Sequence, residues 1–168
     1  MAKLEAEIAR LIREYQAKTG KLLTIGTVES ATGGRIADRI TDVPGSSDYF
    51  KGSVVAYSNE VKTALVRVNR KTIENYGAVS EQTALEMARG AKKLLDVDIC
   101  VSDSGIAGPL GGTAEKPVGL FYFGLAAGDE NLSQKHVFRG NREANKRDAA
   151  EAVLNMMKQY LQRRLKTR

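Results

Sequence analysis

The spacing of apolar residues predicts that helices and strands alternate near the start of the chain. Over Ala2 to Lys18, apolar residues recur at helical spacing with charges between them, which predicts an amphipathic helix that ends near Gly20. Leu22 to Val28 is a short, β-branched apolar run, as expected of a strand. It leads through the turn residues of Glu29 to Gly34 into a second helical pattern, Ile36, Ala37 and Ile40.

The pattern repeats in the next part of the chain. Asp42 to Ser47 carries turn residues, and either of its serines, Ser46 or Ser47, can cap a short helix. A second strand is predicted over Gly52 to Tyr57. Ser58 or Asn59 can cap the helical segment that follows, whose inward-facing residues we expect to be Val61, Leu65 and Val68.

The remaining pattern completes a layered fold. In chain order we predict a helix capped by Ser80, a strand over Ile99–Ser102, an irregular loop over Ser104–Thr113, strands over Val118–Ala127 and Gln134–Phe138, and a helix over Ala144–Leu165. A turn at 128–131 suggests that the last two strands form a hairpin. This order implies an α/β fold, a three-layer α/β/α domain with a mixed sheet of about five or six strands. We expect one domain over residues 1–168.

Composition excludes several functional classes. The hydrophobic fraction of 42% and charged fraction of 27% are typical of globular proteins, and no apolar run is long enough to cross a bilayer. Met1 to Glu7 lacks the apolar core of a secretory signal, so we expect the cytoplasm. With one cysteine and one histidine, the chain has no ligand set for structural zinc. We therefore expect no metal, and Cys100 is predicted to be a small buried residue.

Positive charge is concentrated near the C-terminal end. Ser133 to Arg168 holds ten of the 26 Lys and Arg residues but three of the 20 Asp and Glu residues. Such a segment can attract phosphate-bearing ligands or nucleic acid, and a solvated helix face is the simpler interpretation. Because no helix-turn-helix, zinc finger or aromatic-rich basic strand is visible, we do not expect a nucleic-acid partner.

Ser30 is the first candidate for chemistry. It lies where the predicted strand turns into a helix, so its hydroxyl can project from the end of the sheet. The following residues Thr32, Gly33 and Gly34 can present backbone N–H groups that favour negative charge. The alternative is that Ser30 only caps the helix and that the glycines only form a tight turn.

Lys62 is the candidate base for such a serine. The one histidine, His136, lies on a predicted strand, so no histidine is available for the usual triad. Burial in an apolar crevice lowers the pKa of a lysine and frees its neutral amine to accept a proton. Apolar neighbours make Lys62 suitable, namely Val54, Val55 and Val61. The alternative is an exposed helix lysine.

The glycine-rich loop and Arg142 are candidates for ligand binding. Glycines let a backbone approach a ligand closely or wrap an anion, and the loop candidates are Ser104, Gly105, Gly108, Gly111, Gly112 and Thr113. The loop matches neither common nucleotide-binding motif. Arg142 can grip a phosphate bidentately, although a surface arginine is the alternative. Since loops at the carboxyl ends of strands meet in a crevice, we expect the turns at Ser30, Lys62 and Gly105 to converge.

Six blocks in order carry a family resemblance. They are Val28–Gly34, Thr41–Ser47, Tyr57–Lys62, Gly77–Glu81, Gly105–Pro109 and Glu115–Gly119. Together they resemble the C-terminal domain of the competence/damage-inducible protein CinA, whose stand-alone forms are nicotinamide-nucleotide amidases. The resemblance runs from about Leu4 to Leu161, nearly the whole chain, without the molybdopterin-binding-like domain of full-length CinA.

The resemblance implies hydrolysis of nicotinamide mononucleotide to nicotinate mononucleotide and ammonia, without a cofactor. Ser30 and Lys62 match the family's serine and lysine pair, and Tyr57 matches the tyrosine beside it, which could relay a proton or fix Lys62. The N–H groups around Thr32, Gly33 and Gly34 would meet the oxyanion, while Gly105–Thr113 and Arg142 would hold ribose and phosphate. We expect a small-molecule nucleotide substrate, no membrane partner and a homo-oligomer.

The chain departs from the family pattern at three points, of which the second and third bear on substrate preference. Ala31 stands where many members carry cysteine, which leaves the serine hypothesis intact. Ser102-Asp103-Ser104 is more polar than usual, and Asn141 replaces a common acid. The alternative function is a non-catalytic nucleotide-binding or sensor module, which would need neither Ser30 nor Lys62.

Overall fold

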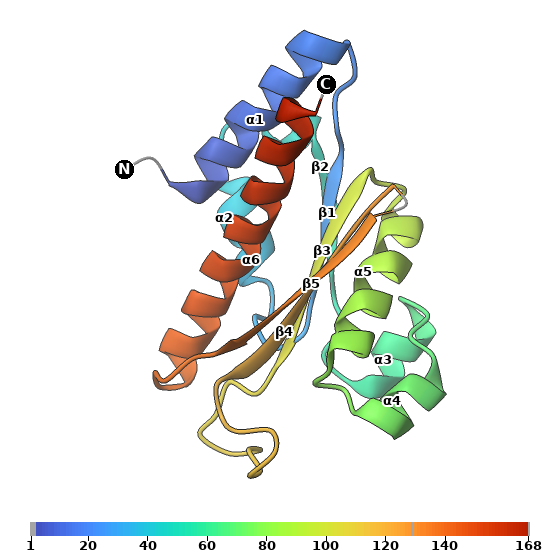
Figure 1. The fold of residues 1–168 in the computed structure, drawn as a ribbon, viewed down its shortest axis with the longest axis vertical. Coiled ribbons are helices and arrows are strands. Elements are labelled where there is room, and N and C mark those ends of the chain that lie inside the picture. The colour runs from blue at the N-terminus through green and yellow to red at the C-terminus, as the bar shows by residue number, and fades with distance from the viewer. Residues whose placement is uncertain (1–2, 129, 168) are drawn as a thin grey trace.

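The computed structural model describes residues 3–128 and 130–167 (Figure 1). In chain order its elements are α1 (Leu4–Thr19), β1 (Ile25–Glu29), α2 (Arg35–Thr41), the 3-10 helix η1 (Ser46–Asp48), β2 (Phe50–Val55), α3 (Asn59–Ala64), α4 (Arg70–Tyr76), α5 (Glu81–Leu95), β3 (Ile99–Gly105), β4 (Leu120–Ala127), β5 (Glu130–Val137) and α6 (Arg142–Lys166). Among these described helices, none combines the length and apolar character that a membrane crossing requires.

A mixed sheet of five strands forms the middle layer. The strands lie in the order β2-β1-β3-β4-β5. β1 pairs in parallel with β2 and β3, whereas β4 is antiparallel to both β3 and β5. The parallel strands β2, β1 and β3 therefore end at the same edge of the sheet, where ligand sites commonly form.

Helices cover both faces of this sheet. α1, α2 and α6 lie on one face, and α3, α4 and α5 lie on the other (Figure 1). Successive strand residues point to opposite faces of the sheet and pack in two separate hydrophobic cores. Ile99 and Val101 of β3 pack in the core beneath α1 and α6, whereas Cys100 packs in the core beneath α5. The predicted three-layer α/β/α fold with a mixed sheet is confirmed. Burial raises the pKa of the Cys100 thiol, as expected of an inert core residue.

Local polar chemistry fixes the predicted helix ends. The Ser58 hydroxyl accepts the Val61 N–H at the start of α3, and the Ser80 hydroxyl accepts the Thr83 N–H at the start of α5. α1 ends at Gly20, whose φ of 74° lies in the left-handed region that glycine tolerates. The caps predicted at Ser58 and Ser80 and the end predicted near Gly20 are confirmed.

Several local predictions are wrong. Neither serine of Ser46–Ser47 caps η1, because Gly45 occupies the cap position. Leu65, predicted to face inward, is half exposed and lies just after α3, which ends at Ala64. β3 continues through Gly105, so Ser104 and Gly105 belong to a strand and not to the irregular loop. In contrast, the predicted pairing of the last two strands as a hairpin is confirmed, because β4 and β5 are consecutive and antiparallel; residue 129 of their link lies outside the described residues.

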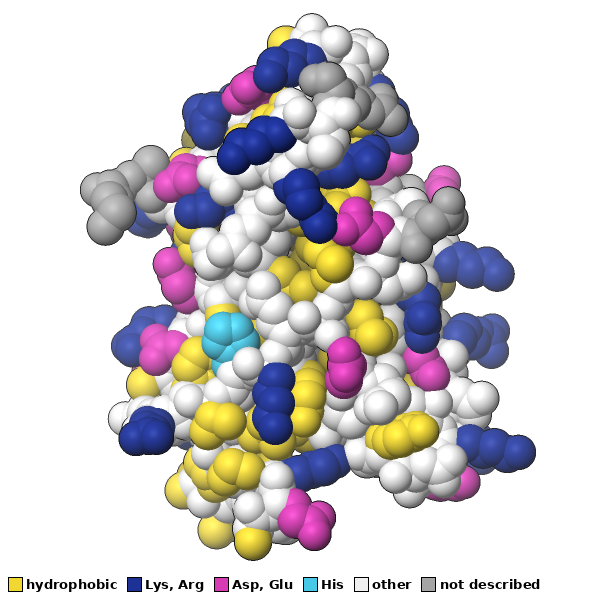
Figure 2. Space-filling view, in the orientation of Figure 1, with side chains coloured by type: hydrophobic (Ala, Val, Ile, Leu, Met, Phe, Trp, Pro, Cys, Tyr) yellow, Lys and Arg dark blue, Asp and Glu magenta, His cyan; other side chains and the backbone are white. Residues whose placement is uncertain are grey.

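Charged side chains are mixed over the visible surface. Figure 2 shows Lys and Arg interspersed with Asp and Glu over this face, with no single continuous basic patch. Part of the basic C-terminal segment is paired, since Lys158 contacts Glu7 and Arg163 contacts Glu130. This arrangement favours the interpretation of α6 as a solvated helix face.

Candidate active site

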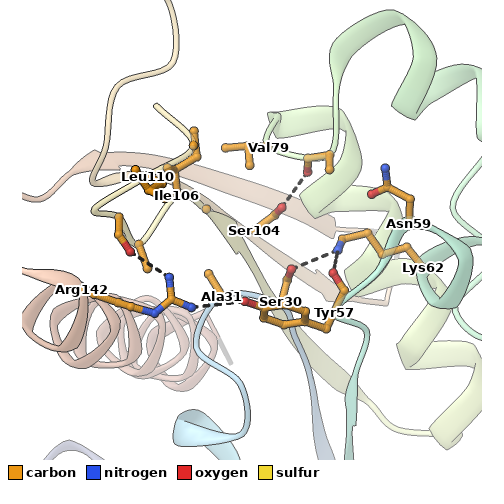
Figure 3. Close-up of a pocket in the computed structure, with 15 residues that line it drawn as sticks. Ser30, Ala31, Tyr57, Asn59, Lys62, Val79, Ser104, Ile106, Leu110 and Arg142 are labelled. Carbon is orange, nitrogen blue, oxygen red and sulfur yellow. Dashed lines mark hydrogen bonds between the residues drawn. The ribbon is translucent and has the colours of Figure 1, made fainter. Parts of the chain in front are cut away.

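The three predicted turns meet at one cavity of about 280 Å³. Ser30 comes from the β1–α2 turn, Lys62 from α3, and Gly105 from the end of β3. All three segments follow parallel strands, so the sheet edge brings them together although they lie far apart in the sequence. The predicted convergence of these turns is confirmed, and Figure 3 shows the side chains around the cavity.

Ser30 and Lys62 form a direct contact in the floor of the cavity. Lys62 Nζ lies 3.0 Å from Ser30 Oγ, 2.9 Å from the Ala56 carbonyl oxygen and 3.0 Å from the Tyr57 carbonyl oxygen (Figure 3). The lysine is 2% exposed and the serine 8%. The structure therefore excludes the exposed-lysine alternative for Lys62.

Burial makes the charge of Lys62 costly. Desolvation lowers the pKa of the Lys62 ammonium, and the negative charge of Asp103 opposes that shift. Among the described residues, no carboxylate lies within ion-pair distance of its Nζ. Burial without a carboxylate partner therefore favours loss of the Lys62 proton, and the neutral amine can still donate to two of its three oxygen neighbours.

Two buried carboxylates hold the Ser30 turn. Asp103 Oδ1 accepts the Ser30 N–H at 3.0 Å, and Asp103 Oδ2 accepts the Thr32 N–H at 3.1 Å. Glu29 accepts the N–H groups at the start of α2, those of Gly34, Ile36 and Ala37. Ser30 itself does not cap α2, whose cap position is Gly34.

These contacts correct the predicted oxyanion donors. The N–H groups of Thr32 and Gly34 are already bonded to Asp103 and Glu29, and neither residue lines the cavity. Gly33 also lies outside the cavity lining. In contrast, Ala31 lines the cavity, and its N–H has no hydrogen-bond partner within the described part of the chain. The residue after a nucleophilic serine commonly supplies such a donor.

Tyr57 contacts Lys62 through its backbone carbonyl and not through its hydroxyl. Its backbone carbonyl accepts from Lys62 Nζ, so Tyr57 helps to fix the amine. Its hydroxyl instead accepts from Arg142 Nη2 at 3.3 Å, and the side chain is 60% exposed. No hydrogen bond joins the Tyr57 hydroxyl to Lys62 among the described residues, so the relay of a proton between them is not supported by this geometry.

Arg142 closes the other side of the cavity. It is the first residue of α6, and its Nη1 donates to the Gly108 carbonyl oxygen at 2.8 Å. Within the described residues it has no carboxylate partner, so its charge is left available to a ligand. In Figure 3, Ser30 and Tyr57 lie between the Arg142 guanidinium and the Lys62 amine.

The glycine-rich segment contributes part of what was predicted. Ser104, Gly105, Gly108 and Gly111 line the cavity, whereas Gly112 and Thr113 do not. Thr113 is turned to its own loop, where its hydroxyl accepts the Lys116 N–H. A Cβ on Gly105 would lie 2.2 Å from the Phe121 ring, so glycine is needed there by close packing.

Four residues that line the cavity were neither named as candidates nor part of the predicted Gly105–Thr113 segment, and they are Ala31, Asn59, Ala78 and Val79. Of these, Ala78 and Val79 come from the segment before α5, and the Ser104 hydroxyl holds them by donating to the Ala78 carbonyl oxygen. Both residues could have been identified from the sequence, because they lie in the Gly77–Glu81 block that carries part of the family resemblance. Within the described residues, no group of three or more His, Cys, Asp or Glu side chains is arranged to hold a metal ion.

Residues 2–161 match the CinA C-terminal domain. The chain belongs to this family. The resemblance carried by the six sequence blocks is thereby confirmed. Each of those blocks lies within the matched residues, and four of them, at Ser30, Lys62, Ala78 and Gly105, contribute to the cavity.

Named relatives agree with this assignment. The chain is 52% identical over 148 residues to a putative competence-damage inducible protein of Halothermothrix orenii, a match that covers 84% of this chain and 36% of that protein. It is 41% identical over 158 residues to a CinA-like protein of Sulfurihydrogenibium, covering 94% of this chain and 38% of the relative. The chain thus spans about a third of the length of these curated relatives.

Solved structures share the fold over nearly their whole length. The competence/damage inducible protein CihA from Agrobacterium tumefaciens has a TM-score of 0.85 at 34% identity, with 94% of each chain covered. A CinA superfamily protein from Klebsiella pneumoniae has a TM-score of 0.86 at 27% identity, covering 96% of this chain and 99% of that one.

Proposed function

We propose that this chain is a serine–lysine amidohydrolase that converts nicotinamide mononucleotide to nicotinate mononucleotide and ammonia. The observation that carries the proposal is the buried Lys62 amine 3.0 Å from the Ser30 hydroxyl at the floor of a cavity. The identity of the substrate rests on the family resemblance, and the unpaired Arg142 at the opposite side of the cavity supports a substrate with a phosphate.

The hydrogen-bond partners of Lys62 suit a neutral amine. A neutral amine has two N–H bonds and one lone pair, which matches two carbonyl acceptors and one hydroxyl donor. With both hydrogens on the Ala56 and Tyr57 carbonyls, the lone pair faces the Ser30 hydroxyl. The two carbonyls therefore orient Lys62 as a general base.

Acyl transfer then follows from the positions of these groups. Lys62 takes the proton from Ser30 as Oγ bonds to the amide carbon, and the oxyanion is met by the Ala31 N–H. Collapse breaks the carbon–nitrogen bond, and Lys62 returns the proton to the departing ammonia. Water then attacks the acyl carbon of the resulting ester while Lys62 accepts a proton from it. The bond from this carbon to Ser30 Oγ breaks, Lys62 returns the proton to Ser30 Oγ, and nicotinate mononucleotide leaves.

Arg142 is assigned to the phosphate of the nucleotide. Its Nη1 donates to the Gly108 carbonyl oxygen and its Nη2 donates to the Tyr57 hydroxyl. Both acceptors belong to residues that line the cavity. A bound phosphate would replace the 3.3 Å contact to Tyr57 with charge-assisted hydrogen bonds. The amide end would then lie over Ser30 and the phosphate end at α6.

Replacing Arg142 with glutamine is expected to raise the KM for nicotinamide mononucleotide roughly 10- to 100-fold, because hydrogen bonds to charged groups are lost. Steady-state ammonia release measures this effect, and kcat should change little. Arg147→Gln is the matched control, since Arg147 lies on the same helix but pairs with Asp148. Equal KM values for both variants, or an equal rise for nicotinamide riboside, which lacks the phosphate, would contradict the assignment of Arg142.

Activity should decline as the pH falls through the pKa of Lys62. The active form is the neutral amine, and burial lowers the pKa of Lys62 from its ordinary value of 10.5. The acid limb of kcat/KM should therefore lie below 10.5, with about a tenfold loss per pH unit beneath it. A limb at the ordinary lysine value, or none at all, would contradict the role of Lys62.

The direct test is ammonia release from nicotinamide mononucleotide by the purified chain. Turnover with formation of nicotinate mononucleotide is the expected result. Saturable binding of the nucleotide without ammonia release would instead support the sensor module. Release from free nicotinamide at the same kcat/KM would show that the nucleotide part is not recognised, and the substrate assignment would be wrong.

A further inference from the structure

A second titratable group lies directly beneath the Ser30–Lys62 pair. Asp103 of β3 is fully buried, and its carboxyl accepts the N–H groups of Ser30 and Thr32. Its side chain does not line the cavity, so Asp103 does not touch the substrate. Among the described residues, no Lys or Arg lies within ion-pair distance of it. Burial without a cation makes its ionised form costly.

One hydroxyl lies between Asp103 and a second buried acid. Thr32 Oγ1 is 2.5 Å from Asp103 Oδ1 and 2.6 Å from Glu29 Oε2. Because a hydroxyl carries one hydrogen, it can donate to only one of these two oxygens. The other contact needs a hydrogen on a carboxyl, since two lone pairs at that separation repel. The geometry thus fits one proton shared by Glu29, Thr32 and Asp103.

Of the two carboxyl groups, that of Asp103 is the more favourable place for the shared proton. Glu29 accepts three backbone N–H groups, which favour its ionised form, whereas Asp103 accepts two. Burial, opposed by hydrogen bonds from Thr32 and assisted by the charge of Glu29, raises the pKa of Asp103 to about 6.

The charge of Asp103 acts on the base. The charged groups that face Asp103 in the described structure are Glu29 from β1 and Lys62 from α3. Ser30 and Thr32, which bond to it from the β1–α2 turn, are neutral. Ionised Asp103 raises the pKa of Lys62 against the lowering effect of burial. When Asp103 is neutral, nothing from this residue opposes the effect of burial on the pKa of Lys62, and the neutral Lys62 amine is favoured.

From this arrangement we propose that Asp103 is a positioning residue that holds the Ser30 turn and sets the charge state of Lys62, through a proton shared with Glu29 across the Thr32 hydroxyl. The catalytic meaning of this role rests on the proposed function, but the effect on Lys62 does not. Asp103 touches neither substrate nor reacting atoms, so it acts through Ser30 and Lys62.

The test combines a titration with a pH–rate profile. Asp103→Asn keeps an oxygen for one backbone N–H of the turn but removes the charge. Nuclear magnetic resonance of the Lys62 amine in protein with 15N-labelled lysine follows its titration midpoint. That midpoint should fall by on the order of one pH unit in Asp103→Asn. The acid limb of kcat/KM should move to lower pH by the same amount.

Asp98→Asn is the matched control. Asp98 immediately precedes β3, and its carboxylate accepts the Thr24 N–H at the end of the strand away from the cavity. This variant should change neither the titration midpoint of Lys62 nor the acid limb of kcat/KM. If Asp103→Asn leaves the Lys62 midpoint at its wild-type value, the proposal is overturned. If the midpoint moves but the wild type releases no ammonia, the proposed amidase function fails and the effect of Asp103 on Lys62 stands.

Thr32 variants keep the proposal testable if Asp103→Asn does not fold. Thr32→Val removes the hydroxyl that lies between Asp103 and Glu29 and through which the proton is shared. The Lys62 midpoint should then move away from its wild-type value, by less than in Asp103→Asn. Thr32→Ser retains the hydroxyl and should restore the wild-type midpoint. Identical midpoints in the Val and Ser variants would overturn the proposed sharing through Thr32.

Discussion

Replacing Ser30 with alanine should lower kcat for ammonia release by roughly 10⁴-fold or more, because the attacking oxygen is removed. The turn itself should persist, since Asp103 holds it through the backbone N–H of residue 30 and not through the side chain. Substrate affinity should therefore change little. Steady-state kinetics and a binding isotherm with nicotinamide mononucleotide measure the two effects separately.

Ser46→Ala is a suitable control for this variant. Ser46 and Ser30 are equally buried, each 8% exposed, but Ser46 lies in η1 and outside the cavity lining. Its replacement should leave kcat unchanged. Retention of wild-type turnover by folded Ser30→Ala would rule out Ser30 as the nucleophile.

Replacing Lys62 with methionine should lower kcat by about 10³-fold, because the general base is lost while an unbranched apolar chain fills the same space. Lys62→Arg should be similarly inactive, since a guanidinium stays protonated at all working pH values. Both variants should bind the nucleotide, because Lys62 is not assigned to its phosphate. Ammonia release and circular dichroism check activity and folding together.

Lys158→Met controls for the loss of a partly buried lysine. Lys158 lies on α6, pairs with Glu7 and has a side chain 20% exposed. Its replacement should leave kcat at the wild-type value. A Lys62→Arg variant that turns over at the wild-type rate would show that no neutral amine is needed at this position.

Much of the fold was predictable because local chemistry and burial pattern agree. The Ser58 and Ser80 hydroxyls satisfy N–H groups at helix starts, so a capping residue before an apolar period marks both helices. β1 is buried throughout, which agrees with its β-branched residues Ile25, Thr27 and Val28. α4 was not predicted, and none of its residues is buried. A helix without a buried face leaves little periodicity in the sequence.

The candidate site was predictable in its members and not in its supporting contacts. Ser30, Lys62 and Gly105 follow strands that end at one sheet edge, so the topology alone brings them together. The bonds of Asp103 to the Ser30 turn depend on the parallel pairing that places Val28 beside Ser102. Spacing along the chain does not reveal such a register. The polar Ser102-Asp103-Ser104 departure was the one available signal, and it was interpreted as bearing on substrate preference.

The oxyanion prediction failed for a related reason. N–H groups beside a serine in a glycine turn look free in a sequence, because the sequence does not show which carboxylates fold back onto them. Here Glu29 and Asp103 occupy the N–H groups of Gly34 and Thr32. The Ala31 N–H remains without a partner in the part of the chain that the structure describes.

The most direct test of the account is to trap the ester on Ser30. Wild-type protein is mixed with nicotinamide mononucleotide, quenched in acid within one turnover, digested and analysed by peptide mass spectrometry. The account predicts that the nicotinate mononucleotide acyl group is attached to the peptide that contains Ser30, and that Ser30→Ala carries none. A wild type that releases ammonia while its acyl group is found on another residue, or on none, would contradict it.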